Sequence, residues 1–263
     1  MTVGEITRVI ESRAPLGLQE DFDNAGLQVG NPDAAATGVL LCTDVTMAVL
    51  DEAVERGFNL VVSHHPLIFH PLKRLTGASL TERLVERALL SGINVYSAHT
   101  NMDNAPGGVS FHMAQRLGLT EVDFLDGHSN PLSPGGVAGS GVIGNVEPQP
   151  AMQIIERAKR VFDVGAVRYS GDVATVVKRV ALCGGAGGFL LNKAVERGAD
   201  LYLSADMRYH DFLEHNNSIV VVDIGHYESE HYTKEIFFAI IREKFPTFAV
   251  DFAKSETNQI KYL

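Results

Sequence analysis

Apolar and polar positions along the chain change between two repeating patterns. Short apolar runs at residues 39–43 and 58–63 indicate buried strands. Between them, residues 46–56 carry apolar side chains at helical spacing, and Gly57 supplies the stop at the end of that helix. Further helices are expected at 2–13, 81–92 and 106–117, and a further strand at 93–99. Short buried strands alternating with helices of about 10–15 residues predict an α/β fold with a largely parallel or mixed sheet.

A change in composition interrupts this alternation in the middle of the chain. Residues 126–150 are rich in Gly, Pro, Ser and Asn, which indicates a linker leading into a hairpin or strand excursion. A helix at 151–162 and a short strand at 166–169 are expected next, and the alternation resumes with a strand at 178–183. We therefore expect a first lobe at residues 1–125 and a second lobe at residues 126–263.

An internal repeat relates the two lobes. Residues 39–65 align without a gap on residues 180–206 at a constant offset of 141, and 11 of the 27 positions are identical. Chance similarity between two strand–helix–strand units is the alternative, but the identical block AVERG in strict register favours duplication. The sequence therefore predicts two similar, interlinked α/β lobes that arose by internal duplication and contain mixed or parallel sheets.

Composition narrows the class of protein. The chain is 45% hydrophobic and 21% charged, which is an ordinary globular mixture. Its formal net charge of −10 argues against extended nucleic-acid binding. Cys42 and Cys183 occupy equivalent apolar strands and are better explained as small hydrophobic residues than as a disulfide or redox pair. With no signal-peptide pattern and no apolar run of about 20 residues, we expect a soluble cytoplasmic protein without a membrane partner.

Polar clusters follow three of the predicted strands. Their members with metal-binding or acid–base side chains are His64 and His65, His99 and Asp103, and His226 and Glu230. In open α/β sheets, ligands bind at the carboxyl ends of the strands. We therefore expect the three clusters to converge on one site.

The spacing within these clusters suits metal coordination. His226 and Glu230 are four residues apart at the start of a predicted helix, so they share one helical face. His64 and His65 are adjacent at a strand end, so their side chains diverge and suit two neighbouring ions better than one. Imidazole and carboxylate groups without a nearby Cys indicate Zn, Fe, Mn, Co or Ni. Because a carboxylate such as Glu230 can bridge two ions about 3.5–4 Å apart, we expect two divalent metal ions per chain.

The alternative is that these histidines are structural, since a single His at a strand end is more often hydrogen-bonded than ligating. For His99 three roles are open: metal ligand, residue that orients a ligand, or proton carrier. The other histidines show no comparable pattern and are expected at surface or structural positions, with His210 and His231 as candidate neighbours of the site.

Several motifs resemble those of the GTP cyclohydrolase 1 type 2 family, also called the NGG-interacting-factor-three-like dinuclear metal proteins. These motifs are DNAGLQVG (23–30), SHHPLIF (63–69), HTNMD (99–103), GGAGG (184–188) and GHYESE (225–230). The resemblance runs from about Glu5 to about Phe245 and implies a duplicated α/β fold, a two-metal site and a ring-shaped homohexamer. One departure is Ala205, which stands where the family more usually has Gly and bears on a turn or the pocket floor.

The resemblance also implies a set of metal ligands. Carried over motif by motif, these ligands are His64, His65, Asp103, His226 and Glu230. The same residues were identified above from their positions after the predicted strands. His99 remains a candidate catalytic residue.

Two glycine-rich segments are candidates for phosphate binding. GSGVIG (139–144) has the spacing of a dinucleotide fingerprint, but the prolines of the following NVEPQP argue against the required helix, which favours a Gly-rich strand or hairpin. GGAGG lies between a strand and a helix and is expected either to bind an anion through backbone N–H groups or to form a tight turn. The residues concerned are Gly184, Gly185, Gly187 and Gly188.

Two acidic positions near strand ends are further candidates. Asp44 follows the strand at 39–43 and is expected to reach the substrate cleft. Asp23 and Asn24 either lie near the site or have the capping or turn role that is usual for these residue types.

The function expected from these residues is that of a metal-dependent hydrolase acting on a nucleotide or a related phosphorylated or heterocyclic small molecule. A metal pair lowers the pKa of bound water to about 7, and the ring opening of GTP that the family name implies is a hydrolysis of this type. The alternative is a non-catalytic oligomer that binds metal or a ligand as a regulator or scaffold. The metals are expected in a cleft between the two lobes, with GGAGG on its rim.

Overall fold

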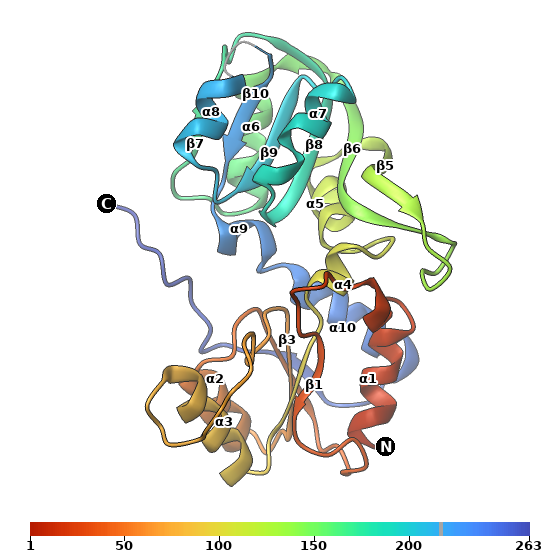
Figure 1. The fold of residues 1–263 in the computed structure, drawn as a ribbon, viewed down its shortest axis with the longest axis vertical. Coiled ribbons are helices and arrows are strands. Elements are labelled where there is room, and N and C mark those ends of the chain that lie inside the picture. The colour runs from red at the N-terminus through yellow and green to blue at the C-terminus, as the bar shows by residue number, and fades with distance from the viewer. Residues whose placement is uncertain (216–217) are drawn as a thin grey trace. The chain divides into compact units, whose positions relative to one another are not determined.

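The computed structural model describes residues 1–215 and 218–263 (Figure 1). Contacts divide this described chain into two compact units that are not continuous in sequence. Unit 1 comprises residues 1–105, 131–135 and 233–259, and unit 2 comprises residues 106–130, 136–232 and 260–263.

Unit 1 is a mixed sheet covered by helices on both faces. Its strands are β1 (Gly26–Val29), β2 (Val39–Cys42), β3 (Leu60–Ser63), β4 (Asn94–Ser97) and β11 (Val250–Phe252), in the order β1-β4-β3-β2-β11. Every pairing is parallel except that of β1 with β4. All residues of β2, β3 and β4 are buried, as expected for parallel strands covered on both sides.

The helices of unit 1 form two layers. They are α1 (Val3–Glu11), α2 (Met47–Glu55), α3 (Leu80–Leu90), α4 (Thr100–Asp103) and α10 (Thr233–Lys244), with a 3-10 turn at Leu16–Leu18. Helices α2 and α3 pack together on one face, and α1 packs against α10 on the other (Figure 1). Helix α1 begins with a capping box in which Thr2 and Glu5 satisfy each other's backbone N–H groups. The core under α2 and α3 is aliphatic, with Leu50, Val61 and Val85 among its buried members.

Unit 2 contains a larger mixed sheet. Its strands are β5 (Thr120–Ser129), β6 (Val137–Pro150), β7 (Arg168–Ser170), β8 (Val176–Ala186), β9 (Leu201–Ala205) and β10 (Val220–Asp223), in the order β5-β6-β8-β9-β10-β7. Strands β8, β9 and β10 run parallel, whereas β5, β6 and β7 pair antiparallel with their neighbours. The helices are α5 (Val109–Leu117), α6 (Ala151–Val161), α7 (Leu191–Glu196), α8 (Tyr209–His215) and α9 (His226–Glu230), with a 3-10 turn at Gly188–Leu190.

The strand registers support the duplication inferred from the sequence. In unit 1, Val39 of β2 pairs in parallel with Leu60 of β3. In unit 2, Val180 of β8 pairs in parallel with Leu201 of β9, and both residues lie 141 positions after their counterparts. The offset that aligns the two sequences therefore also aligns two hydrogen-bonded strand pairs. The predicted α/β fold with duplicated elements and mixed sheets is confirmed.

The hairpin expected within residues 126–150 is present as the long β5–β6 hairpin, but its first strand begins at Thr120 and no linker precedes it. GSGVIG lies within β6, in agreement with its interpretation as a Gly-rich strand. Gly139 is required there, because a Cβ at this position would lie 2.3 Å from the carbonyl oxygen of Asp126 on the partner strand.

The two units also differ from a division at residue 125. Helix α5 and strand β5 belong to unit 2, and residues 233–259 return to unit 1, where β11 pairs with β2 and α10 packs on α1. Within the described residues, no helix is long and apolar enough to cross a membrane.

The buried carboxylate of Glu256 joins residues 233–259 to the rest of unit 1. The ammonium group of Lys234 at the start of α10 contacts the carboxylate of Glu256, and their side chains are only 14% and 2% exposed. The other oxygen of Glu256 accepts the backbone N–H groups of Thr43 and Asp44, directly after β2. This carboxylate therefore connects the end of a central strand to the segment that follows β11.

We expect Lys234→Met to lower the free energy of unfolding by about 3–5 kcal/mol, because Glu256 would stay buried without its counter-charge. Chemical denaturation followed by circular dichroism measures this loss. The matched control is Glu243→Ala, which removes the exposed ion pair with Arg13 and should cost less than about 1 kcal/mol. Equal effects of the two substitutions would contradict the assigned role of the buried pair.

Candidate metal centre

Three imidazole rings gather at the carboxyl ends of two neighbouring strands in unit 1. His64 and His65 directly follow β3, and His99 follows β4, which pairs in parallel with β3. The ring centroid of His64 lies 5.0 Å from that of His65 and 5.3 Å from that of His99. One potential ligand atom from each ring lies within 4.8 Å of the others, so these side chains could hold a metal ion.

His64 is the fully buried member of this group. Its Nδ1 lies 3.0 Å from the carbonyl oxygen of Ala98, which can only accept, so Nδ1 carries the proton and donates it. This tautomer leaves Nε2 as the nitrogen with a lone pair. Nε2 lies 3.8 Å from Oδ1 of Asp103, close to the separation of about 3–4 Å that two ligands of one ion adopt.

His65 is oriented by a carboxylate from the neighbouring strand. Its Nδ1 lies 2.8 Å from Oδ1 of Asp44, which follows β2. Asp44 is expected from the sequence to reach the substrate cleft, and in the structure its carboxylate contacts His65. Its backbone N–H is held in turn by Glu256, 3.1 Å away.

His99 is oriented by Asp23, which the sequence offered only as a candidate neighbour of the site. Nδ1 of His99 lies 2.8 Å from Oδ1 of Asp23, and the other oxygen of Asp23 accepts the backbone N–H of Thr100 at 3.0 Å. Burial of Asp23 opposes its ionisation, but hydrogen bonds from His99 and Thr100 outweigh this effect and hold the pKa of the carboxyl well below its ordinary value. Asp23 is therefore a stable carboxylate partner for the imidazole.

A second histidine–carboxylate cluster lies at the carboxyl edge of the sheet in unit 2. His226 and Glu230 lie one turn apart on α9, which follows β10, and Nε2 of His226 is 2.9 Å from Oε2 of Glu230. Nδ1 of His226 is 2.7 Å from Oδ2 of Asp206, which follows β9. The side chain of Glu230 is only 4% exposed. The sequence does not predict Asp206 as a site residue. It shows only that Asp206 occupies the position in the second repeat that His65 occupies in the first.

Gly185 makes room for Glu230. Its φ of +60° belongs to the left-handed region, and a Cβ at this position would lie 2.1 Å from Oε1 of Glu230. Its backbone N–H donates to the hydroxyl of Ser229 at 2.9 Å, which fixes the loop against α9. The glycine is therefore needed for both its conformation and its lack of a side chain.

The hydrogen bonds of the GGAGG segment favour a tight turn over an anion site. The N–H of Gly184 donates to Ser110, and that of Gly187 donates to the hydroxyl of Ser204 at 3.0 Å. Gly185 is engaged with Ser229, as described above. These hydrogen bonds occupy the backbone N–H groups that an anion site would need. Nothing in these contacts indicates Gly188 as an anion ligand.

The spacing of His99 to Asp103 equals that of His226 to Glu230, but the two pairs are not equivalent in the fold. Asn94 of β4 pairs with Leu60, and Val220 of β10 pairs with Leu201, the counterpart of Leu60 in the repeat. Thr100 and His226 each lie six residues beyond these strand positions, so His226 corresponds to Thr100.

The other candidate neighbours are engaged in ring contacts. His231 stacks on Tyr227 with a centroid distance of 5.0 Å, and His210 contacts Tyr209 edge to face at 5.5 Å. Tyr209 and His210 are both exposed, so their contact lies at the surface.

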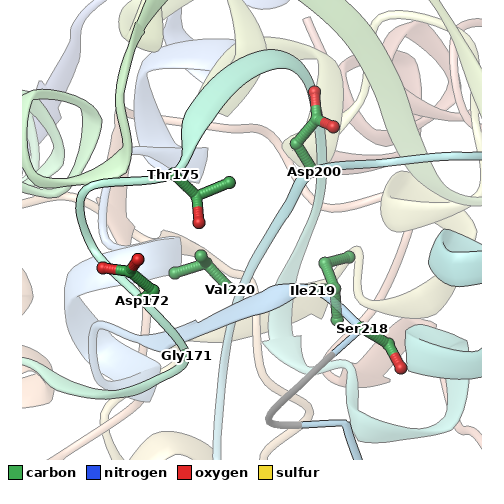
Figure 2. Close-up of a pocket in the computed structure, with 7 residues that line it drawn as sticks. All are labelled: Gly171, Asp172, Thr175, Asp200, Ser218, Ile219 and Val220. Carbon is green, nitrogen blue, oxygen red and sulfur yellow. The ribbon is translucent and has the colours of Figure 1, made fainter.

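A separate pocket of about 540 Å³ lies at the opposite edge of the sheet in unit 2 (Figure 2). It is lined by Thr175, Asp200 and Ser218, which precede β8, β9 and β10, so it lies at the amino ends of the parallel strands. Asp200 accepts the backbone N–H groups of Lys178 and Arg179 at 2.8 and 2.9 Å. The carboxylate of Asp200 therefore holds the start of β8 in place. The candidate functional site remains at the other edge of the sheet, where the carboxyl ends of the parallel strands lie.

The fold and these clusters define the class of protein: a duplicated α/β protein with histidine and carboxylate groups at the carboxyl ends of its parallel strands. The family model described as Duf34/NIF3 (NGG1p interacting factor 3) matches residues 1–260. The chain therefore belongs to the Duf34/NIF3 family.

Individual relatives agree with this assignment. A Lactococcus lactis protein named GTP cyclohydrolase 1 type 2 homolog is 34% identical over 254 residues, covering 94% of this chain and 93% of that protein. A Clostridium acetobutylicum protein of the same name is 31% identical over 232 residues, covering 88% and 85% of the two chains. The crystal structure of Staphylococcus aureus protein SA1388 matches with a TM-score of 0.90 and 24% identity, covering 100% of this chain and 99% of that chain.

We expect Gly185→Ala to displace the carboxylate of Glu230 and to weaken divalent-metal binding, because the new methyl group would overlap Oε1. The matched control is Gly198→Ala, since Gly198 has a similar φ of +71° but nothing within 4 Å of the position that a Cβ would take. The control should show only the backbone cost of about 1–2 kcal/mol. Denaturation midpoints and metal titrations measure both effects, and indistinguishable variants would contradict the crowding argument.

Proposed function

We propose that this chain is a dinuclear metal-dependent hydrolase. The ligands would be His64, His65, Asp103, His226 and Glu230. The observation that carries the proposal is a shared orientation: each imidazole at the candidate centre has its Nδ1 directed at an oxygen atom. For His65, His99 and His226 this oxygen belongs to a carboxylate, and for His64 it belongs to a backbone carbonyl.

This arrangement fits the requirements of a metal site. Metal-binding histidines commonly donate one ring N–H to a carboxylate or carbonyl, which fixes the tautomer and directs the other nitrogen at the ion. The nitrogen and oxygen donors of this set suit Zn, Fe, Mn, Co or Ni. The proposal of two ions per chain rests on the size of the donor set, because five ligands exceed the four of a single tetrahedral site.

The residues of the candidate centre would have different roles in the reaction. A divalent metal pair, when bound, supplies a Lewis acid and lowers the pKa of bound water. His99 would hold or transfer a proton at Nε2, and the ionised Asp23 at Nδ1 would stabilise the protonated ring. Asp44 and Asp206 would fix the orientations of His65 and His226.

The substrate class rests on the relatives' names. Proteins named GTP cyclohydrolase 1 type 2 homolog are 31–34% identical to this chain over most of its length. We propose a nucleotide or a related heterocyclic or phosphorylated small molecule. The alternative function is a non-catalytic metal-binding role, and the experiments below distinguish the two.

The purified protein should carry close to two divalent transition-metal ions per chain. His65→Ala and Glu230→Ala should each lower this content without unfolding the protein, because the cores of both units are built from other, aliphatic side chains. The matched control is His128→Ala, an exposed histidine on β5 that should leave the metal content unchanged. Elemental analysis with circular dichroism gives the readout, and full occupancy in either ligand variant would remove that residue from the ligand set.

Hydrolysis of GTP, other nucleotides or phosphoesters should require the metal and be lost on chelation. His99→Gln should keep the metal content but lower kcat by a factor of about 10²–10⁴, the usual contribution of a general acid or base. Steady-state kinetics on protein with measured metal content tests both points. Stoichiometric metal with no metal-dependent turnover of any of these substrates would favour the non-catalytic role.

A further inference from the structure

A continuous series of aromatic rings leads from the histidine cluster of unit 1 to the surface. The ring centroid of Phe69 lies 6.2 Å from that of His99 and 6.4 Å from that of Phe22. His99 in turn contacts His65 with a centroid distance of 5.5 Å. The two phenylalanines therefore extend the imidazole cluster in space, although they are 47 positions apart in sequence.

Exposure rises steadily along this series. The side chain of His64 is fully buried and that of His99 is 18% exposed, whereas Phe69 is 38% and Phe22 is 65% exposed. Scattered exposed apolar residues are normal on protein surfaces. An adjoining pair of exposed phenyl rings that is continuous with a candidate catalytic histidine is a more specific feature.

One neighbour of each ring-bearing residue is anchored by hydrogen bonds. Ile68, which precedes Phe69, donates its N–H to Gln28 of β1 at 2.9 Å and accepts a hydrogen bond from the side chain of Asn24 at 2.6 Å. Asp23, which follows Phe22, is fixed by its bonds to His99 and Thr100. The exposure of the rings is therefore a property of an ordered segment, and the Asn24–Ile68 bond ties the two ring-bearing segments together.

The two phenyl rings make tilted or edge contacts with their neighbours. Phe69 meets His99 and His70 edge to face, at centroid distances of 6.2 and 4.9 Å. The planes of Phe22 and Phe69 are inclined by 58°, so the rings do not stack on each other. Phenyl rings have no hydrogen-bond donors for a phosphate or sugar, and the partner that suits their faces is another flat aromatic ring.

We propose that Phe22 and Phe69 form a stacking platform for the planar heterocycle of the substrate, next to His99. This inference rests on the proposed hydrolase function and narrows its substrate class to molecules that contain a nucleobase-like ring, in preference to simple phosphoesters. The platform would supply affinity for the base, and the metal centre with His99 would supply the chemistry.

The probe is 2-aminopurine riboside, a fluorescent nucleoside whose emission is quenched by stacking. The chain contains no Trp, so base fluorescence can be followed without interference from indole. With the intact, metal-loaded protein we expect saturable quenching, which adenosine 5′-monophosphate should reverse by competition and ribose 5-phosphate should not.

Phe69→Ala and Phe22→Ala should each weaken binding of the probe by about tenfold, the lower part of the range for loss of one base–aromatic stack. Phe69→Leu should also weaken it, because it keeps apolar bulk but removes the ring face, whereas Phe69→Tyr should restore it. The matched control is Leu90→Ala, an 81% exposed residue at the end of α3, where the chain enters β4 at its amino end. This control should bind the probe like the unsubstituted protein.

Three outcomes would overturn the platform: no saturable quenching, equal competition by ribose 5-phosphate, or unchanged binding in both alanine variants. If light scattering instead showed that these variants change the oligomeric state while probe binding is unaltered, the rings would form a contact between copies of the chain. Metal content and kcat at saturating GTP are measured on the same samples. They report on the metal centre, because loss of a stacking ring weakens substrate binding without removing the metal, so a failure of the platform is distinguishable from a failure of the metal centre.

Discussion

The candidate centre depends on the hydrogen bond between an imidazole Nδ1 and a fixed oxygen atom. A free histidine side chain presents either nitrogen and rotates about two bonds, so a cluster of histidines is not by itself a binding site. Here the carbonyl of Ala98 and the carboxylates of Asp44, Asp23 and Asp206 select one tautomer and one orientation for each ring. These oxygens follow or adjoin strand ends, so the sheets determine the site geometry through their edges.

Equivalent strand ends in the two duplicated units carry different residues. Asp44, just beyond β2, is equivalent to Gly185 near the end of β8, whereas the position of His65 in unit 1 is taken by Asp206 in unit 2. In unit 1 the first strand of the repeat therefore supplies the orienting carboxylate and the second supplies the imidazole. In unit 2 the second strand supplies the carboxylate, the imidazole comes from α9, and glycine makes space for Glu230. The repeat conserves the backbone frame while the chemical roles of its strand ends have been reassigned.

Local patterns in the sequence were sufficient for the fold class, the repeat and the histidine-bearing strand ends, because each depends on short-range periodicity or on identity at fixed register. The partners of the histidines were not predictable in the same way. Asp23 lies 76 positions before His99, and its contact with the imidazole depends on how the loop before β1 passes the end of β4. The glycines of GGAGG suit either an anion or a turn, and the serines that accept their N–H groups come from distant segments. Residues 233–259 join unit 1 through parallel pairing of β11 with β2, a long-range contact for which no repeat or motif gives a signal.

That late pairing has a consequence for biosynthesis. A chain emerging from the ribosome presents every strand of unit 2 before it presents α10 and β11, which complete unit 1. Until then the edge of β2 lacks its partner and α1 lacks the helix that packs on it. Unit 1 thus begins first along the chain but receives its last strand only after all the strands of unit 2. Its nascent form exposes a strand edge of the kind that invites wrong pairing or chaperone capture.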